Sequence, residues 1–319
     1  MIVNSKRRLA HLLGYPLDWL QEIALHADKL YDPFTDYSGK KPRVIERPIK
    51  ALRDLQRRIY KIMLRGAQSF RFAHAGVPGR SIAKAVRPHS KRPLVLTADI
   101  QNFYPSIKDR TVFKLWRELG CGVAVASLLT RLTTYHNHLP QGASTSMALA
   151  NLALERFDNR LFTLLRRRFP DLRYSRWVDD MVFSGTVAPD IIYKTVAAEL
   201  RKLGLRLHHT RRKRRVMPAG ARQEILGLVV NRCPSLSRRR RRLTRAIVHN
   251  FKKHGRGIAS VKGHIQYLRT FHNQIADQLQ DSIRLVPVLF TNRQPSRYRR
   301  VRAIVRRAAG PAGHHESRQ

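Results

Sequence analysis

Hydrophobic residues recur at helical spacing along several stretches of the chain. Leu52, Leu55 and Ile59 lie on one face of a helix that the pattern predicts over residues 49–64. The same period predicts further helices at residues 16–30, 109–118, 122–132, 145–168 and 192–203. The prolines and the glycine of residues 32–42 instead predict a turn or loop.

Two short segments without helical period predict strands that carry acids. Residues 93–100 form a short apolar run, which predicts a buried strand with an acid, Asp99, at its end. β-prone residues over 174–183 flank Asp179 and Asp180, which predicts a hairpin with both acids at its bend. The order of strands and helices, with further helices appended, predicts an α+β fold.

The C-terminal third of the chain, residues 236–310, mixes apolar residues at helical spacing with runs of arginine. The apolar residues are Leu243, Ile247, Val248, Ile265, Tyr267, Leu268 and Phe271. This interleaving predicts helices with one packed face. The arginines of the other face are then either simply solvated or bound to the phosphates of a nucleic acid.

Composition adds a large excess of positive charge. The 319 residues include 63 Lys and Arg against 21 Asp and Glu, so the net charge is +42. A hydrophobic content of 43% is enough for a core, which excludes a disordered basic tail. Because such charge repels itself, a polyanion is the simplest partner, and nucleic acid is the first candidate. Residues 201–319 carry +26 of the charge, and residues 1–200 carry +16.

Cysteine usage and hydropathy restrict the compartment. Cys121 and Cys233 are far apart, so neither a disulfide framework nor a zinc spacing is present. That pattern is typical of a reducing compartment, and we expect a cytoplasmic protein. No run of eighteen apolar residues occurs, so the sequence predicts no membrane association through a spanning segment.

Three aspartates in apolar segments stand out against the basic background. A single exposed Asp in such a protein is most simply a salt-bridge partner. Asp179 and Asp180 differ, because adjacent like charges in an apolar frame are costly unless a cation holds them. Oxygen ligands without His or Cys suit Mg²⁺ or Mn²⁺. With Asp99 opposite the hairpin, two such ions could stabilise the attacking and leaving oxygens of a phosphoryl displacement.

Four segments, in order along the chain, resemble motifs of the reverse transcriptases. Residues 177–180 (Trp-Val-Asp-Asp) are similar to the family's x-x-Asp-Asp signature, and residues 99–107 are similar to its palm strand. Residues 139–152 resemble the Pro-Gln-Gly motif, and residues 43–56 resemble the fingers motif. The resemblance covers about residues 35–270. It implies a right-hand polymerase fold with fingers, a palm of antiparallel sheet plus helices, and a helical, basic thumb.

The resemblance also implies a division into three parts. Residues 1–92 would form the N-terminal helices and fingers. Residues 93–232 would form the palm, with a fingers insertion around residues 109–140. Residues 233–319 would form the thumb and a basic C-terminal segment that binds RNA.

Roles at the active site follow from the positions that match the family's motifs. The catalytic residues would be Asp99, Asp179 and Asp180, and these with the Ile100 carbonyl would bind two Mg²⁺ or Mn²⁺ ions. The residues implied at the incoming dNTP are Lys41, Arg43, Ile100, Tyr104, Gln141 and Lys213. Tyr104 occupies the place of the sugar gate, whose ring would exclude a ribose 2′-OH. Lys213 would donate a proton to pyrophosphate, or, as part of a basic run, bind the nucleic-acid backbone.

Candidate RNA contacts lie in two regions of the sequence. They are His89, Arg238, Arg239, Arg241, Arg242 and Arg245. For His89 the alternative is a structural histidine whose hydrogen bonds are satisfied inside the fold.

Two further segments, residues 76–89 and 224–231, resemble retron-type enzymes. That type implies synthesis of single-stranded cDNA from a dedicated structured non-coding RNA in bacterial anti-phage defence, with an effector protein as a further partner. The sequence does not give the oligomeric state. Residues 85–89 keep only the His of one retron motif, and residues 225–227 keep only the Gly of another. The alternatives are a defence-associated reverse transcriptase outside the retrons, with its own non-coding RNA, and a non-catalytic RNA-binding scaffold. A scaffold has no use for three acids facing RNA.

Overall fold

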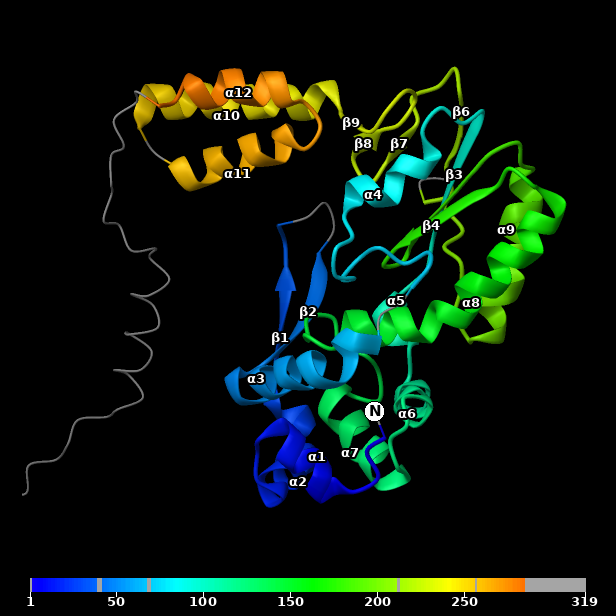
Figure 1. The fold of residues 1–319 in the computed structure, drawn as a ribbon, viewed down its shortest axis with the longest axis vertical. Helices are drawn as coiled ribbons and strands as arrows, with labels where there is room; N and C mark the ends of the chain where they lie inside the picture. The colour runs from blue at the N-terminus through cyan, green and yellow to red at the C-terminus, as the bar shows by residue number, and fades with distance from the viewer. Residues whose placement is uncertain (1, 39–41, 68–69, 211–212, 256, 285–319) are drawn as a thin grey trace, which may run out of the picture. The chain divides into compact units, whose positions relative to one another are not determined.

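A four-stranded antiparallel sheet, in the order β4-β5-β3-β6, carries the three aspartates (Figure 1). Its strands are β3 (Leu94–Asp99), β4 (Arg173–Trp177), β5 (Asp180–Ser184) and β6 (Val216–Pro218). Trp177 pairs with Asp180, so only Val178 and Asp179 form the turn between β4 and β5. Both sequence predictions for this sheet, the strand at 93–100 and the hairpin with acids at its bend, are confirmed.

The computed structural model of the chain describes residues 2–38, 42–67, 70–210, 213–255 and 257–284. It consists of two compact units, Met1–Ser235 and Leu236–Gln319. The boundary lies three residues after the predicted start of the thumb at residue 233. The predicted division of the first unit into fingers and palm stays a prediction.

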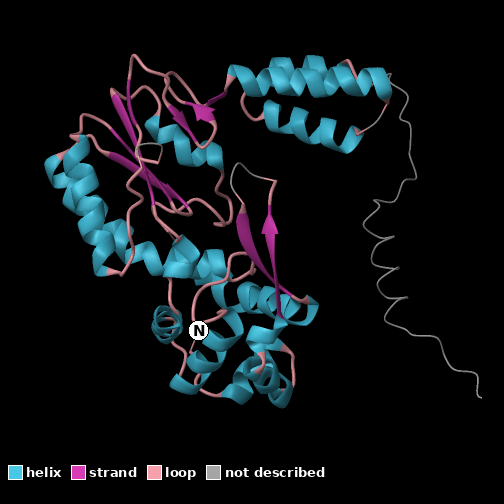
Figure 2. Ribbon diagram, turned by 180° about the vertical axis from the view of Figure 1, so that it is seen from behind, coloured by secondary structure: helices cyan, strands magenta, loops and turns pink. Residues whose placement is uncertain are grey.

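Two long helices, α8 (Ser146–Arg168) and α9 (Pro189–Lys202), lie along one face of this sheet (Figure 2). Their apolar residues form one core with the strands, because the i, i+3, i+4 spacing directs Leu154, Phe157, Leu161, Ile192, Val196 and Leu200 to the same side as Leu96, Met181 and Phe183. The predicted helix at 145–168 is confirmed to within one residue. The burial of both strand faces around Asp99 gives the aspartates a rigid base.

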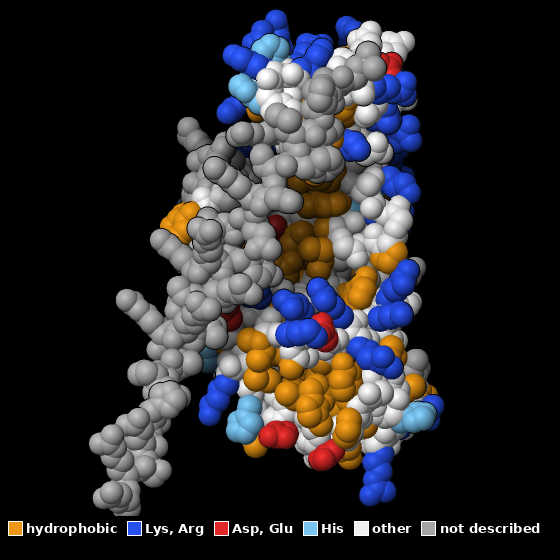
Figure 3. All heavy atoms as spheres, turned by 90° about the vertical axis from the view of Figure 1, so that its left-hand side faces the viewer, with side chains coloured by type: hydrophobic (Ala, Val, Ile, Leu, Met, Phe, Trp, Pro, Cys, Tyr) orange, Lys and Arg blue, Asp and Glu red, His pale blue; other side chains and the backbone are white. Residues whose placement is uncertain are grey.

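The remaining helices of the first unit lie in two places: most gather around its N-terminal part, whereas α4 (Ile82–Val86) packs beside β4 (Figure 1). They are α1 (Lys6–Leu13), α2 (Leu17–Leu25), α3 (Lys50–Ile59), α4 (Ile82–Val86), α5 (Phe103–Ser106), α6 (Asp109–Glu118) and α7 (Val123–Thr133), with the short helical turns η1 (Ala27–Leu30), η2 (Tyr60–Leu64), η3 (Arg65–Ala67) and η4 (Arg87–His89). On the face in Figure 3, hydrophobic side chains gather over the N-terminal helices, with Lys and Arg side chains beside them. On this face, an apolar patch and basic side chains therefore lie next to each other.

The predicted loop at residues 32–42 is wrong over much of its length. β1 (Tyr31–Asp36) pairs antiparallel with β2 (Arg43–Pro48), with Phe34 opposite Ile45. Proline is tolerated in such an exposed two-stranded ribbon, where a strand has a free edge. Helix α1 was also not predicted from the pattern, although Ser5 accepts a hydrogen bond from the Arg8 amide at 3.1 Å and caps it.

Within residues 236–255 and 257–284, the second unit contains three helices, α10 (Arg238–His254), α11 (Ile258–Arg269) and α12 (Asn273–Asp281). The buried apolar residues of these helices are Val248, Phe251, Val261, Ile265, Leu268 and Ala276, and Ile283, just after α12, is also buried. Of the seven apolar residues in the prediction, Val248, Ile265 and Leu268 are buried and Ile247, Tyr267 and Phe271 are half-buried, so the packed face is confirmed for these six. Leu243 is 46% exposed and does not belong to it. The short strands β7 (Glu224–Ile225), β8 (Leu228–Val229) and β9 (Ser235–Leu236) precede these helices. None of the described helices has both the length and the apolar composition to cross a bilayer.

Candidate active site

The three predicted aspartates meet at one end of the four-stranded sheet. Asp99 is the last residue of β3 and pairs directly with Asp180, the first residue of β5. The Ile100 amide donates to the Asp179 carbonyl at 3.2 Å, which fixes the hairpin turn against the end of β3. The Asp99 side chain is 5% exposed, whereas Asp179 and Asp180 are half-buried and reach solvent.

This concentration of acids is electrostatically costly. Burial raises the pKa of Asp179, and the charge of Asp99 raises it further. Burial, with the charges of Asp179 and Asp99, raises the pKa of Asp180 to about 7. Lys213 forms an ion pair with Asp99 through Nζ and Oδ2. Burial opposes the charge of Lys213, but its hydrogen bond to Asp99 and the neighbouring carboxylates raise its pKa overall. One ammonium group therefore compensates only part of the negative charge.

The donor set fits hard divalent cations that are shared with a substrate. Within the described ranges, no group of three or more His, Cys, Asp and Glu side chains could hold a metal ion. Mg²⁺, however, is usually bound through one or two carboxylates together with substrate phosphates and water, not by a protein cage. Repelling carboxylates, paired here with an ammonium group, are the arrangement that such a cation would stabilise.

Two of the predicted nucleotide contacts, Arg43 and Tyr104, lie within electrostatic reach of the acids. Arg43 is exposed at the start of β2, and its charge lowers the pKa of Asp179. Tyr104 lies in α5; burial and the charge of Asp179 raise its pKa to about 12. Lys41, the other predicted cation, lies outside the described residues. Both side chains are therefore coupled electrostatically to Asp179, and their contact with a nucleotide stays a prediction.

Gln141, on the predicted nucleotide-binding loop, is fixed to strand β2 by Glu46. The Glu46 carboxylate accepts the Gln141 amide at 3.0 Å, and the Glu46 amide donates to the Gln141 carbonyl at 2.8 Å. His138 Nε2 lies 3.0 Å from the other carboxylate oxygen of Glu46. Glu46 and His138 were not predicted from the sequence. The only sign of a special role was that Glu46 is a lone acid in an exposed, basic strand. These contacts join the loop to the strand that carries Arg43.

Gly142 allows this close approach. Its φ of +133° lies outside the range that L side chains readily adopt. A Cβ there would lie 3.0 Å from Ile45 Cγ2 and 3.2 Å from the Glu46 carbonyl oxygen. Steric crowding and the positive φ therefore explain why the Pro-Gln-Gly motif has glycine at position 142.

A cavity of about 330 Å³ adjoins the acids. It is lined by Thr97, Asp180, Met181, Val182, Lys213, Arg215, Ile225, Leu226 and Gly227. Its size is at the lower end of small-ligand sites, about 300–1,000 Å³. Of the predicted site residues that the structure describes, only Asp180 and Lys213 line it.

The predicted RNA contact at His89 is wrong, and the structural alternative holds. His89 is fully buried, with Nδ1 2.7 Å from Ser184 Oγ and Nε2 2.8 Å from Ser175 Oγ. Burial, together with the charge of Arg92, lowers its pKa to about 3, so the ring stays neutral. Both ring nitrogens are occupied by the serines, and His89 ties β4 to β5 instead of meeting a ligand.

The predicted arginines of the second unit are available to an anionic ligand. Arg238, Arg239, Arg242 and Arg245 are exposed on α10, and Arg241 is half-buried. The first turn of α10 has no acidic residue. Arginines in that turn oppose the helix dipole, which favours anions at an N-terminus. The exposed arginines are open both to water and to an anionic partner, so RNA binding by them stays a prediction.

The raised pKa of Asp180 has a consequence for stability without metal. Between pH 3.8, its ordinary pKa, and about 7, the folded chain binds a proton that the unfolded chain has released. The free energy of unfolding should therefore fall as pH rises through this window. Asp180→Asn removes the effect. Thermal unfolding in chelator between pH 5 and 8 should show a steeper decline for the wild type than for the variant, and Mg²⁺ should restore the wild type at pH 8. Parallel declines would contradict the shift.

Comparisons with known proteins match this arrangement. The model of the family described as reverse transcriptase (RNA-dependent DNA polymerase) matches residues 37–228. The chain is 34% identical over 227 residues to the retron Mx65 reverse transcriptase of Myxococcus xanthus, covering 65% of this chain and 52% of that protein. It is 27% identical over 278 residues to the retron Ec86 reverse transcriptase of Escherichia coli, covering 84% of each. It thus spans about half the length of the Mx65 protein.

A solved structure has a similar fold. This is the telomerase from Candida albicans in complex with a fragment of telomeric RNA. The TM-score is 0.51 at 11% sequence identity, and the match covers 86% of this chain and 58% of the telomerase chain.

Proposed function

Because the chain belongs to the reverse transcriptase family and is of the retron type, we propose that it copies a dedicated structured non-coding RNA into single-stranded cDNA from dNTPs. Its fold is the α+β, right-hand polymerase fold, as the sequence predicted. The observation that carries the proposal is the pairing of Asp99 with Asp180, with Asp179 at the turn beside them. Acids in these positions support phosphoryl transfer, which an RNA-binding scaffold does not need.

The nucleotidyl transfer of the family requires divalent metal ions. We propose that Asp99, Asp179, Asp180 and the Ile100 carbonyl hold two of them, Mg²⁺ or Mn²⁺. When bound, such ions neutralise charge on the phosphate oxygens during in-line displacement. Asp99, one of these residues, also forms the ion pair with Lys213.

The surrounding residues would then act on the nucleotide. Arg43, with Lys41, would hold the triphosphate, since a guanidinium fork suits phosphate oxygens. Gln141, fixed by Glu46, would contact the base or sugar of the incoming dNTP. Lys213, whose raised pKa keeps it protonated, would donate a proton to the leaving pyrophosphate.

RNA would be the principal partner, bound in part by the α10 arginines. The exposure of Arg238, Arg239, Arg242 and Arg245 supports this assignment, since exposed arginines can contact phosphates. The similarity to retron enzymes supports the retron type over a defence enzyme outside the retrons. An effector protein and an anti-phage role stay predictions from that similarity.

Sequencing the nucleic acid that co-purifies with the chain tests the retron assignment. We expect one RNA species joined covalently to DNA that is complementary to part of it. Digestion with ribonuclease and with deoxyribonuclease, each followed by sizing, identifies the joint. Unbranched repeat DNA would instead indicate the other defence class, and RNA without any DNA would favour the scaffold.

A further inference from the structure

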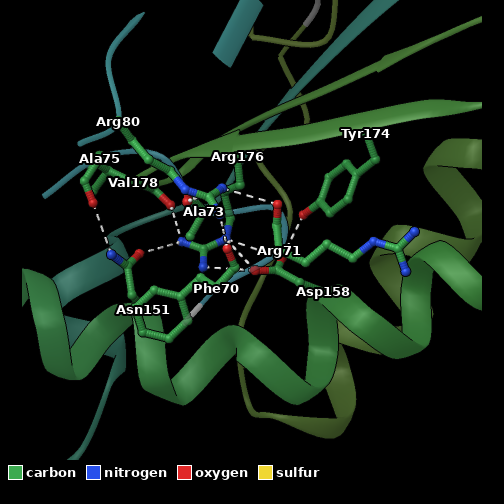
Figure 4. A network of polar contacts seen from close by, with 10 residues as sticks. All are labelled: Phe70, Arg71, Ala73, Ala75, Arg80, Asn151, Asp158, Tyr174, Arg176 and Val178. Carbon is green, nitrogen blue, oxygen red and sulfur yellow. Dashed lines mark hydrogen bonds and ion pairs between the residues drawn. The ribbon is translucent and has the colours of Figure 1, made fainter. Parts of the chain in front are cut away.

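A buried cation, Arg176 of β4, lies beneath the hairpin turn that carries Asp179 (Figure 4). Its side chain is fully buried, and its main partner Asp158, on α8, is 4% exposed. Neither residue borders the cavity beside Asp180. The pair is therefore a buried charge cluster that the proposed chemistry does not use.

The guanidinium of Arg176 connects α8 to the hairpin turn. Nε and Nη2 donate to Asp158 Oδ2 at 2.9 and 2.8 Å. Nη1 donates in two directions, to Asn151 Oδ1 at 3.1 Å and to the Val178 carbonyl at 2.8 Å. Tyr174 Oη donates to the other Asp158 oxygen at 2.6 Å. The planar guanidinium of Arg176 thus joins Asp158 and Asn151 of α8 to the main chain next to Asp179.

The carbonyl that Arg176 binds belongs to a strained residue. Val178 has a φ of +58°, a left-handed conformation in which a β-branched residue is a rare outlier. A two-residue hairpin loop requires positive φ at its first position, where glycine or asparagine is usual. A residue keeps such a strained backbone conformation only where several surrounding interactions hold it there. The hydrogen bond from Arg176 is one such constraint, applied one residue before Asp179.

Stability alone does not explain the buried pair. Apolar residues of similar volume often stabilise a core as well as a buried ion pair does. They cannot, however, donate to the Val178 carbonyl. The main chain of β4 is held separately, because the Arg176 amide donates to the Phe72 carbonyl at 2.8 Å and its carbonyl accepts from His74 at 2.9 Å. The part of the hairpin that depends on the guanidinium is therefore the turn.

We propose that Arg176 is a positioning residue: it holds the Val178 carbonyl in its strained conformation and so directs the Asp179 carboxylate into the site. The proposal rests on the proposed polymerase function for its consequence in turnover. Its effect on divalent cation binding does not depend on that function.

Arg176→Lys tests the proposal, with Tyr174→Phe as the matched control. Lysine keeps a cation beside Asp158 but lacks the fork that reaches Val178 at the same time. Tyr174→Phe removes a hydrogen bond from the same cluster without touching the turn. We expect Arg176→Lys to lower kcat for dNTP incorporation about 10- to 100-fold, with the KM for dNTP nearly unchanged. Tyr174→Phe should keep the wild-type kcat.

Removing the backbone strain at residue 178 should partly restore the kcat of Arg176→Lys. Glycine adopts positive φ freely, so adding Val178→Gly to Arg176→Lys should recover part of the lost kcat. A structural role for Arg176 would give no such recovery. Wild-type kcat in Arg176→Lys, or equal losses in Arg176→Lys and Tyr174→Phe, would overturn the proposal.

Cation binding supplies a readout that does not require activity. The rise in unfolding temperature with Mg²⁺ should need a higher Mg²⁺ concentration in Arg176→Lys than in the wild type and Tyr174→Phe. A wild-type chain that shows this rise but no dNTP incorporation would contradict the polymerase function and leave the positioning role measurable. If Arg176→Lys does not fold, the apolar triple variant Arg176→Met/Asp158→Leu/Tyr174→Phe takes its place, with the same expected shift. An unchanged Mg²⁺ dependence in the folded variant would overturn the proposal.

Discussion

Replacing both Asp179 and Asp180 by alanine should abolish dNTP incorporation, with a loss of at least about a thousandfold. The two carboxylates, with Asp99, supply the negative charge at the end of the sheet that would hold divalent cations. Without them, the phosphate charge that develops during displacement has no cation to neutralise it. Extension of a labelled primer on an RNA template, in Mg²⁺, measures the effect.

The loss must be separated from a change in net charge or in folding. Asp18→Ala/Glu22→Ala is a matched control, since it removes two acids from the exposed face of α2. This control should incorporate dNTP at the wild-type rate. The Asp179→Ala/Asp180→Ala variant should also unfold at a temperature at least equal to that of the metal-free wild type, because it loses repelling carboxylates. A variant that is folded and fully active would exclude these residues from catalysis.

Substitution of Tyr104 should give the second large effect, on sugar selectivity. Tyr104→Ala removes the half-buried ring of α5 that the resemblance assigns to the sugar gate. If the ring excludes a ribose 2′-OH, the ratio of kcat/KM for ribonucleotide to that for deoxynucleotide should rise about 10- to 100-fold. Competition between a dNTP and the matching rNTP on one template measures this ratio.

Tyr104→Phe is the control for the sugar gate. It keeps the ring and removes only the hydroxyl, so selectivity should match the wild type. The account predicts that steric bulk, and not the phenol, decides the sugar. Unchanged selectivity in Tyr104→Ala would place the gate elsewhere.

The helices and strands that could be predicted are those whose pattern of apolar residues lies within a single segment of the sequence. The apolar run before Asp99 and the acids between β-prone residues identify the central strands, because burial on both faces leaves a continuous hydrophobic pattern. Helix α8 follows from its 3.6-residue period. The β1–β2 ribbon was missed because Pro33 is typical of loops, and only pairing with residues 43–48 makes a strand of it.

Contacts between distant residues could not be predicted in this way. Glu46 meets His138, 92 residues later, through tertiary packing alone. His89 is enclosed by serines 86 and 95 residues away, so its burial is invisible in the sequence. Arg176 directly precedes the motif of residues 177–180, yet its partner Asp158 and its proposed role under the turn depend on how α8 packs. The sequence motifs identify the acids, whereas the residues that position these acids depend on tertiary packing.

The most direct test of the central claim is synthesis on an RNA of defined sequence. Purified wild-type chain, annealed primer and template, labelled dNTPs and Mg²⁺ should yield DNA whose sequence is complementary to the RNA. The same reaction should fail with chelator and with Asp179→Ala/Asp180→Ala. Product whose sequence does not follow the template, or no product above that of the double variant, would contradict the assignment as an RNA-directed DNA polymerase.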